Sequence, residues 1–143
     1  MTIYLLDENV LRELRPGGNA NVQAWYATVS TAALRISAMT FFEKRRGAER
    51  LRKTDPDRAT RLLADIDALE AAYGSRLIPV DGPVVAEWAR LLGAKDKNQR
   101  DRALAATARV HGFVLVTRNV ADVTGCEVDV LDPFHTAPEV IRV

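Results

Sequence analysis

Apolar residues along the chain gather in five short runs, each about as long as a β-strand. The first and fourth runs are almost continuously apolar, which is typical of strands covered on both faces, as in a parallel sheet. The runs are Ile3–Leu6, Leu34–Ser37, Leu77–Val80, Phe113–Val116 and Val128–Leu131. We therefore predict five buried strands.

Between these runs the apolar spacing becomes that of amphipathic helices. Asp55 and Pro56 open one of them, since an N-cap residue followed by proline at the first helical position is a start signal, and Gly74 can end it. The other helical patterns are Val22–Val29, Val84–Leu92 and Ala103–Val110. Strands that alternate with helices predict a single α/β domain over residues 1–143, with a core over 1–132 and a C-terminal tail over 133–143.

Composition narrows the class of protein. With 143 residues, 48% of them apolar and 27% charged, the chain is expected to fold as one globular domain with a real core. No apolar run approaches the roughly 20 residues of a membrane span, and no signal peptide is visible, so we expect no membrane association. The single cysteine, Cys126, excludes an intrachain disulfide framework and fits a reducing cytoplasm.

The net charge of +1 hides an uneven distribution. Eight basic residues lie between Lys44 and Arg61, and only three acids oppose them. Such a patch can be a phosphate-binding surface or merely the solvated face of a helical hairpin, and the sequence leaves both interpretations open.

Four carboxylates are expected near the carboxyl ends of the predicted strands, where open α/β sheets have their binding and active sites. Each has an ordinary structural explanation as a helix cap or a turn residue, for instance the capping box Thr40-x-x-Glu43. Together, acids gathered at the carboxyl ends of strands would repel one another unless a cation joins them, and hard oxygen ligands suit Mg²⁺ or Mn²⁺. The four are Asp7, Glu43, Asp101 and Asp122.

Four stretches resemble, in the right order, the PIN-domain family, and specifically VapC-like toxin ribonucleases of type II toxin–antitoxin pairs in the FitB-like branch. The most specific is the third, in which an acid precedes an alanine-rich helix, His-Gly and a strand ending in Thr-Arg-Asn. The stretches are "LLDENVLREL", "ISAMTFFEKRRGAERL", "DRALAATARVHGFVLVTRNVAD" and "VDVLDPF".

This resemblance implies a PIN fold, a central parallel sheet flanked by helices on both faces. It also implies a toxin that is an Mg²⁺- or Mn²⁺-dependent endoribonuclease hydrolysing RNA phosphodiester bonds. The implied partners are RNA, a second copy of the chain, and a small VapB-like antitoxin whose basic side chain enters the acidic site. The toxin and antitoxin would form a hetero-oligomer in the cytoplasm.

Carried over residue by residue, Asp7, Glu43 and Asp101 match the family's first, second and third acids. The resemblance implies that Asp7 and Asp101 hold the metal. Asp122 is expected to complete the catalytic acids together with Glu43.

The chain departs from the family pattern at three positions. Arg102 stands where a small residue is common after the third acid. Glu8 stands where a small hydroxyl residue is usual, and Asn119 stands where aspartate is common, so Asn119 or Asp122 can serve as the fourth position. Supporting roles are expected for Asn9, Asn119 and Thr117. RNA contacts are expected from the basic segment, at Arg45, Arg46 and Arg50.

Other functions fit the residues less well. A response-regulator-like phosphoacceptor domain has a similar length and acids after its first strand, but it needs a lysine near the end of a late strand, and this chain has none after Lys97. A metal-free nuclease would have to use His111 and His135, the only histidines. A PIN-like module that only binds, with a decayed site, is the remaining alternative.

Overall fold

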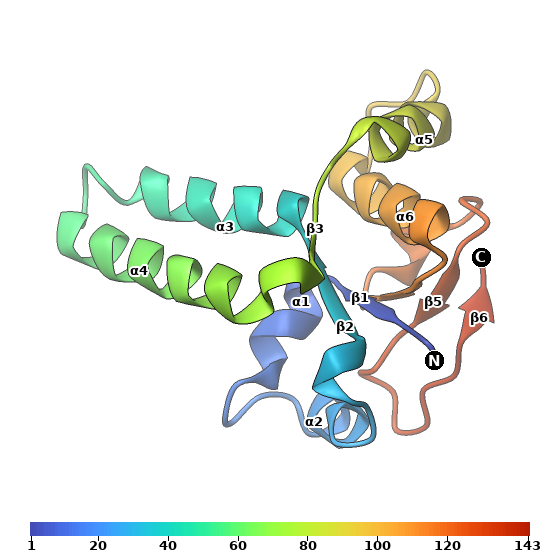
Figure 1. Ribbon diagram of the computed structural model, residues 1–143, viewed down its shortest axis with the longest axis horizontal. Coiled ribbons are helices and arrows are strands. Elements are labelled where there is room, and N and C mark those ends of the chain that lie inside the picture. The colour runs from blue at the N-terminus through green and yellow to red at the C-terminus, as the bar shows by residue number, and fades with distance from the viewer.

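A six-stranded sheet forms the centre of the computed structural model, which describes all residues from 1 to 143 (Figure 1). The strand order is β3–β2–β1–β4–β5–β6, so β1 lies inside the sheet between β2 and β4. The strands are β1 Tyr4–Leu6, β2 Leu34–Ser37, β3 Leu77–Ile78, β4 Val114–Val116, β5 Asp129–Leu131 and β6 Ile141–Arg142. The first five pair in parallel, and all five predicted strands are confirmed.

Helices connect the strands, and their ends follow the sequence signals. The Asp55 carboxylate accepts a hydrogen bond from the Arg58 N–H at 3.2 Å, and Gly74 ends the same helix with a φ of 53°, a conformation that favours glycine. The helices are α1 Glu8–Leu11, α2 Ala20–Tyr26, α3 Ala38–Arg50, α4 Pro56–Tyr73, α5 Gly82–Leu92 and α6 Gln99–His111. Short 3-10 helices occupy Arg12–Leu14, Thr31–Ala33, Gly74–Arg76 and Val120–Val123.

Both faces of the sheet are covered, because successive residues of β1 point to opposite sides. Leu5 packs in a cluster with Leu104 and Ala108 of α6, whereas Leu6 packs in a cluster with Val10 of α1 and Val22 of α2. The predicted fold class, a sheet flanked by helices on both faces, is therefore confirmed.

Helices α3 and α4 form a hairpin that extends away from the sheet (Figure 1). Its own apolar cluster contains Phe41 and Ile66, and the cluster continues to Ile36 in β2. Arg45 joins the two helices, because its guanidinium bonds Asp67 of α4 at 2.7 Å. An apolar cluster and an ion pair thus hold the two helices of the hairpin together.

Residues 133–143, which were predicted to be a tail, include a β-strand. They return along the sheet edge, and β6 pairs antiparallel with β5, with Ile141 opposite Val130. The segment predicted as a tail therefore contributes one short strand, which the sequence analysis did not predict, and the sheet is mixed at one edge. No helix of the chain is long and apolar enough to span a membrane.

Candidate functional site

Asp7 is fixed at the carboxyl end of β1 by the sheet itself. Its backbone N–H donates to the Val116 carbonyl at 2.9 Å, which continues the β1–β4 ladder by one residue. Thr117, one residue past β4, is held in the same way by the Leu131 carbonyl at 3.0 Å. The two strands are neighbours, so the polar residues that follow them meet, as the sequence predicted.

The Asp7 side chain is buried, with 9% of its surface exposed, and it accepts three hydrogen bonds. Oδ1 accepts the Glu8 N–H at 2.7 Å, and Oδ2 accepts the Thr117 hydroxyl at 2.7 Å and the Asn9 amide at 3.2 Å. The first of these is a helix cap, so the capping explanation holds for Asp7. The other two orient the carboxylate toward a pocket.

That pocket has a volume of about 380 Å³ and is mostly polar. It brings together Asp7, which directly follows β1, with Glu43 of α3 and Asp101 of α6, three residues that are far apart in the chain. Its lining residues are Asp7, Glu8, Asn9, Arg12, Met39, Thr40, Glu43, Arg100, Asp101, Leu104, Arg118 and Asn119.

Asp101 is the third residue of α6, and its environment disfavours its charge. Burial, and then the negative charges of Asp7 and Asp122, raise the pKa of Asp101 above its ordinary value, against the opposing effects of Asn119 and Arg100. It does not cap α6, because Asn98 takes the N-cap position. A bound cation would relieve the repulsion that raises this pKa.

Glu43 enters the same pocket from α3 but is already paired. Arg100 Nη1 donates to Glu43 Oε2 at 2.8 Å, and Arg100 immediately precedes Asp101 in α6. The capping-box interpretation of Thr40 and Glu43 was wrong, because Ser37 caps α3 through a bond to the Met39 N–H at 3.0 Å. The helix begins earlier than predicted, so Thr40 and Glu43 both lie within it and face the pocket.

The sequence left two candidates for the fourth position, Asn119 and Asp122. Asn119 lines the pocket, and its backbone N–H donates to the Thr117 hydroxyl at 3.0 Å. Asp122 lies in the 3-10 helix Val120–Val123 and does not line the pocket, although its charge contributes to the raised pKa of Asp101.

The carboxylates do not form a ready-made cage. No group of three or more Asp, Glu, His or Cys side chains is arranged to hold a metal ion. Mg²⁺, however, is commonly held by one or two carboxylates, with waters and substrate phosphates as its remaining ligands. Asp7 and Asp101, buried or half-buried and mutually repulsive, fit that kind of site.

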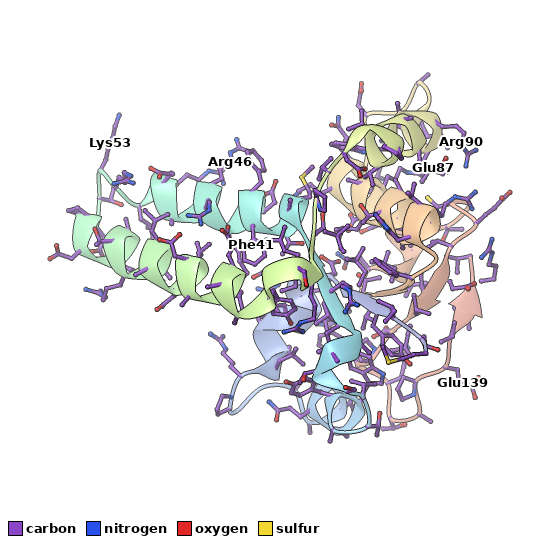
Figure 2. The ribbon with its side chains drawn as sticks, viewed as in Figure 1. Phe41, Arg46, Lys53, Glu87, Arg90 and Glu139 are labelled. Atoms are coloured by element: carbon purple, nitrogen blue, oxygen red, sulfur yellow. The ribbon has the colours of Figure 1, made fainter.

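The basic residues of the Lys44–Arg61 segment, which include the predicted RNA contacts Arg45, Arg46 and Arg50, are not all free to bind a ligand. Arg45 binds Asp67 and Glu70 of α4, and Lys44 binds Glu8 at 3.0 Å, so these two cations are engaged within the protein. Arg46 and Arg50 are exposed and form no ion pair, and Figure 2 shows Arg46 projecting from α3 on the side away from α4.

Sequence reasoning missed three arginines of the pocket. Arg12, Arg100 and Arg118 all line it, and Arg118 also lies 4.9 Å from the centre of the Phe134 ring. Arg118 belongs to the Thr-Arg-Asn motif and Arg100 adjoins Asp101, so their proximity in sequence to predicted site residues could have indicated that they line the pocket.

A mostly parallel sheet between helices, with an acidic pocket where β1 and β4 end, defines an open α/β domain whose candidate site lies at the carboxyl ends of its strands. The chain belongs to the PIN domain family, whose model matches residues 4–121. It is 30% identical to toxin FitB of Neisseria gonorrhoeae over 93% of this chain and 99% of that protein. It is 27% identical to VapC ribonuclease Y4jK of Sinorhizobium fredii over 94% of this chain and all of that protein.

Solved structures agree with this assignment. The chain is similar to the structure of FitAcB from Neisseria gonorrhoeae, with a TM-score of 0.77 and 29% identity over 93% of this chain and 99% of that one. DNA-bound VapBC from Salmonella typhimurium shares the fold, with a TM-score of 0.63 and 21% identity over 85% of this chain and 90% of that one. The resemblance to PIN-domain toxins is thus confirmed, and the phosphoacceptor alternative is not supported.

Proposed function

We propose that this chain is the toxin of a type II toxin–antitoxin pair and cleaves RNA as an Mg²⁺- or Mn²⁺-dependent endoribonuclease. The observation that carries the proposal is the shared pocket of Asp7 and Asp101, in a chain similar along its length to toxin FitB and to a VapC ribonuclease. Asp7 and Asp101 would hold the metal. When bound, the metal would activate water and stabilise the negative charge that develops on the phosphate.

The other residues of the pocket have roles that follow from their contacts. Thr117 and Asn9 fix the orientation of the Asp7 carboxylate through their hydrogen bonds. Arg12 and Arg118 also line the pocket, and guanidinium groups are suited to bind phosphate oxygens of the RNA backbone. These contacts would position the scissile phosphate beside Asp7.

The decisive experiment compares Asp7→Asn and Asp101→Asn with a matched control. Asparagine caps a helix nearly as well as aspartate, so the fold should survive while RNA cleavage and growth arrest are lost. Asp57→Asn, which removes an exposed acid from the first turn of α4, should keep full activity. Circular dichroism reports on the fold, and excess chelator should abolish cleavage by the unmodified protein.

Three outcomes would reject parts of the proposal. Full toxicity of Asp7→Asn would leave Asp7 with its capping role alone. Equal cleavage with and without chelator would remove the metal. Retained RNA binding without any cleavage would identify the chain as a binding module with a decayed site.

The proposed antitoxin has a candidate binding surface beside the pocket. An apolar groove of about 320 Å³ between α3 and α4 is lined by Leu62, Leu69 and Gly47, and Glu8 and Glu43 lie at its edge. An apolar antitoxin segment could fill this groove while a neighbouring arginine pairs with the carboxylates in a bidentate geometry.

Gly47 offers a way to test the antitoxin surface without disturbing the fold. A Cβ at Gly47 would meet no atom within 4 Å, so Gly47→Leu should fold and obstruct the groove, whereas Gly47→Ala should still bind. The assay is co-expression with the neighbouring small gene, followed by size-exclusion chromatography. Separate elution of the unmodified chain and the small protein, with toxicity unrelieved, would reject the toxin–antitoxin assignment and leave the nuclease assignment standing.

A further inference from the structure

A second groove adjoins the acidic pocket on the side away from α4. It has a volume of about 510 Å³, within the range of ligand sites, and lies between α3 and the junction of α5 with α6. It shares four lining residues with the acidic pocket, so the two form one continuous surface. The shared residues are Met39, Glu43, Arg100 and Asp101.

Two aromatic side chains line this groove, and one of them, Phe42, is exposed. Phe42 is 56% exposed and is among the few large apolar side chains on the surface. Trp88 lines the groove from α5, and its indole N–H donates to the Gln99 carbonyl at 2.9 Å, which fixes the ring. Exposed aromatic faces of this kind bind unpaired nucleobases by stacking, whatever the base.

Polar groups suited to a nucleotide surround these rings. Arg46 lines the groove and pairs with no carboxylate, and Arg100 is 68% exposed with only one of its nitrogens bonded to Glu43. Asn98 has a left-handed backbone with a φ of 59°, and its side chain does not cap α6, so its amide is free to bond a base edge. The two arginines can bind the phosphates that flank such a base.

We propose that this groove binds an unpaired nucleotide next to the scissile phosphate, with its base stacked on Phe42 and its phosphate held by Arg46 or Arg100. The proposal rests on the proposed ribonuclease function and adds to it a base-binding subsite beside the acidic pocket. A base can reach Phe42 only if it is out of a helical stack, so the substrate would be single-stranded or looped RNA. Because the two pockets are continuous, the RNA strand would run from the groove into the acidic pocket.

The test is a binding measurement in excess chelator, where cleavage cannot confuse the result. The probes are fluorescent eight-nucleotide oligo(A), oligo(U) and oligo(C), and a fully paired RNA duplex of the same length, followed by anisotropy. Single strands should bind more tightly than the duplex. Phe42→Ala should weaken single-strand binding by roughly 10-fold, the loss expected for one stacked base, while Phe42→Trp keeps it.

Two further variants sharpen the measurement. Arg46→Ala should also weaken binding and lower its salt dependence, because one phosphate contact is lost. Val85→Ala is the matched control, since Val85 is 48% exposed on α5 and lines neither pocket, and it should bind like the unmodified protein.

Several results would overturn the proposal. Unchanged single-strand binding by Phe42→Ala would do so, as would equal affinity for duplex and single strand. If Phe42→Ala instead converts a dimer to a monomer in light scattering and leaves RNA affinity unchanged, the groove is an interface between two copies. In these cases the nuclease assignment stands, whereas failure of the unmodified protein to bind any of the RNAs would count against the proposed function itself.

Discussion

The hydrogen bond from the Thr117 hydroxyl to Asp7 is a buried contact whose removal should be measurable in both stability and activity. The two atoms lie 2.7 Å apart, and Thr117 is only 2% exposed. Thr117→Val removes the hydroxyl with almost no change of shape, so no cavity is created. What is lost is a bond to a charged carboxylate, and the partner oxygen stays largely buried.

The expected size follows from the partners that are lost. A hydrogen bond to a charged group contributes about 1.5 to 3 kcal/mol. Valine also deprives the Asn119 N–H of its acceptor at 3.0 Å, which adds about 0.5 to 1 kcal/mol, because this group is partly exposed and can turn to water. The free energy of unfolding should therefore fall by about 2 to 4 kcal/mol, and Tm by about 6 to 12 °C for a domain of this size.

The assay is urea unfolding followed by circular dichroism at pH 7, with two controls. Thr117→Ser keeps the hydroxyl and should lose only about 1 kcal/mol for the buried methyl group. Thr124→Val removes an exposed hydroxyl whose nearest acceptor, the Val120 carbonyl, is 3.5 Å away, and it should stay within about 0.5 kcal/mol. RNA cleavage by Thr117→Val should fall about 10- to 100-fold, as for other residues that orient a metal ligand.

An unfolding free energy for Thr117→Val within about 0.5 kcal/mol of the unmodified protein would refute this reasoning. It would mean that the hydroxyl does not bond the carboxylate. Full cleavage activity in a clearly destabilised Thr117→Val would separate the two claims, because the bond would then stabilise the fold without orienting the site.

The remaining predictions concern charges. Asp101→Asn should raise Tm near pH 7 in metal-free buffer, because a carboxylate with a raised pKa destabilises the folded state once it is ionised. In scanning fluorimetry, Mn²⁺ should raise the Tm of the unmodified protein but not that of this variant. The pKa of Glu87 is lowered to about 2, chiefly by its hydrogen bond to Arg90; Figure 2 labels both residues. The ionised carboxylate therefore stabilises the fold above its ordinary pKa of 4.5, and this effect is lost as the pH falls toward 2. Glu87→Gln should flatten the decline of the unfolding free energy between about pH 5 and pH 2, measured by urea unfolding. Arg100→Ala should free Glu43 from its ion pair and tighten Mn²⁺ binding by about fivefold in calorimetry, which is equivalent to roughly 1 kcal/mol for an exposed ion pair. An unchanged Mn²⁺ affinity would show that Glu43 takes no part in metal binding.

The parts of the fold that the sequence predicted well are those that hydrophobic burial dictates. β1 and β4 are surrounded by side chains on both faces, so their apolar runs carried a clear signal. The meeting of Asp7 and Thr117 followed from the same logic, because adjacent parallel strands end at the same edge. β6 was missed because Ile141 and Arg142 are both exposed, and a strand that buries little leaves no pattern.

Polar interactions were predicted less well, because they depend on which elements meet in space. The start of α3 was misjudged, since Ser37 and Thr40 are both acceptable caps and only the chain path selects Ser37. The bond between Arg100 and Glu43 joins residues 57 positions apart, and no local pattern indicates it. Arg45 was predicted to contact RNA because its acidic partners, Asp67 and Glu70, lie in another helix, α4, and no local pattern indicates the pairing.

The charge balance of the acidic pocket links the metal and the RNA in the proposed reaction. Four acids and three arginines line it: Asp7, Glu8, Glu43 and Asp101, with Arg12, Arg100 and Arg118. With Arg100 on Glu43 and Lys44 on Glu8, much of the negative charge is already neutralised within the protein, so the free chain should attract a metal only moderately. RNA phosphates would draw the arginines toward themselves and leave the carboxylates less compensated, which favours the cation. Because coupling between two ligands is reciprocal, a bound metal would strengthen RNA binding by the same factor. Arg100 is the residue through which this coupling would act, since it pairs with Glu43 and also lines the groove that we assign to the nucleotide.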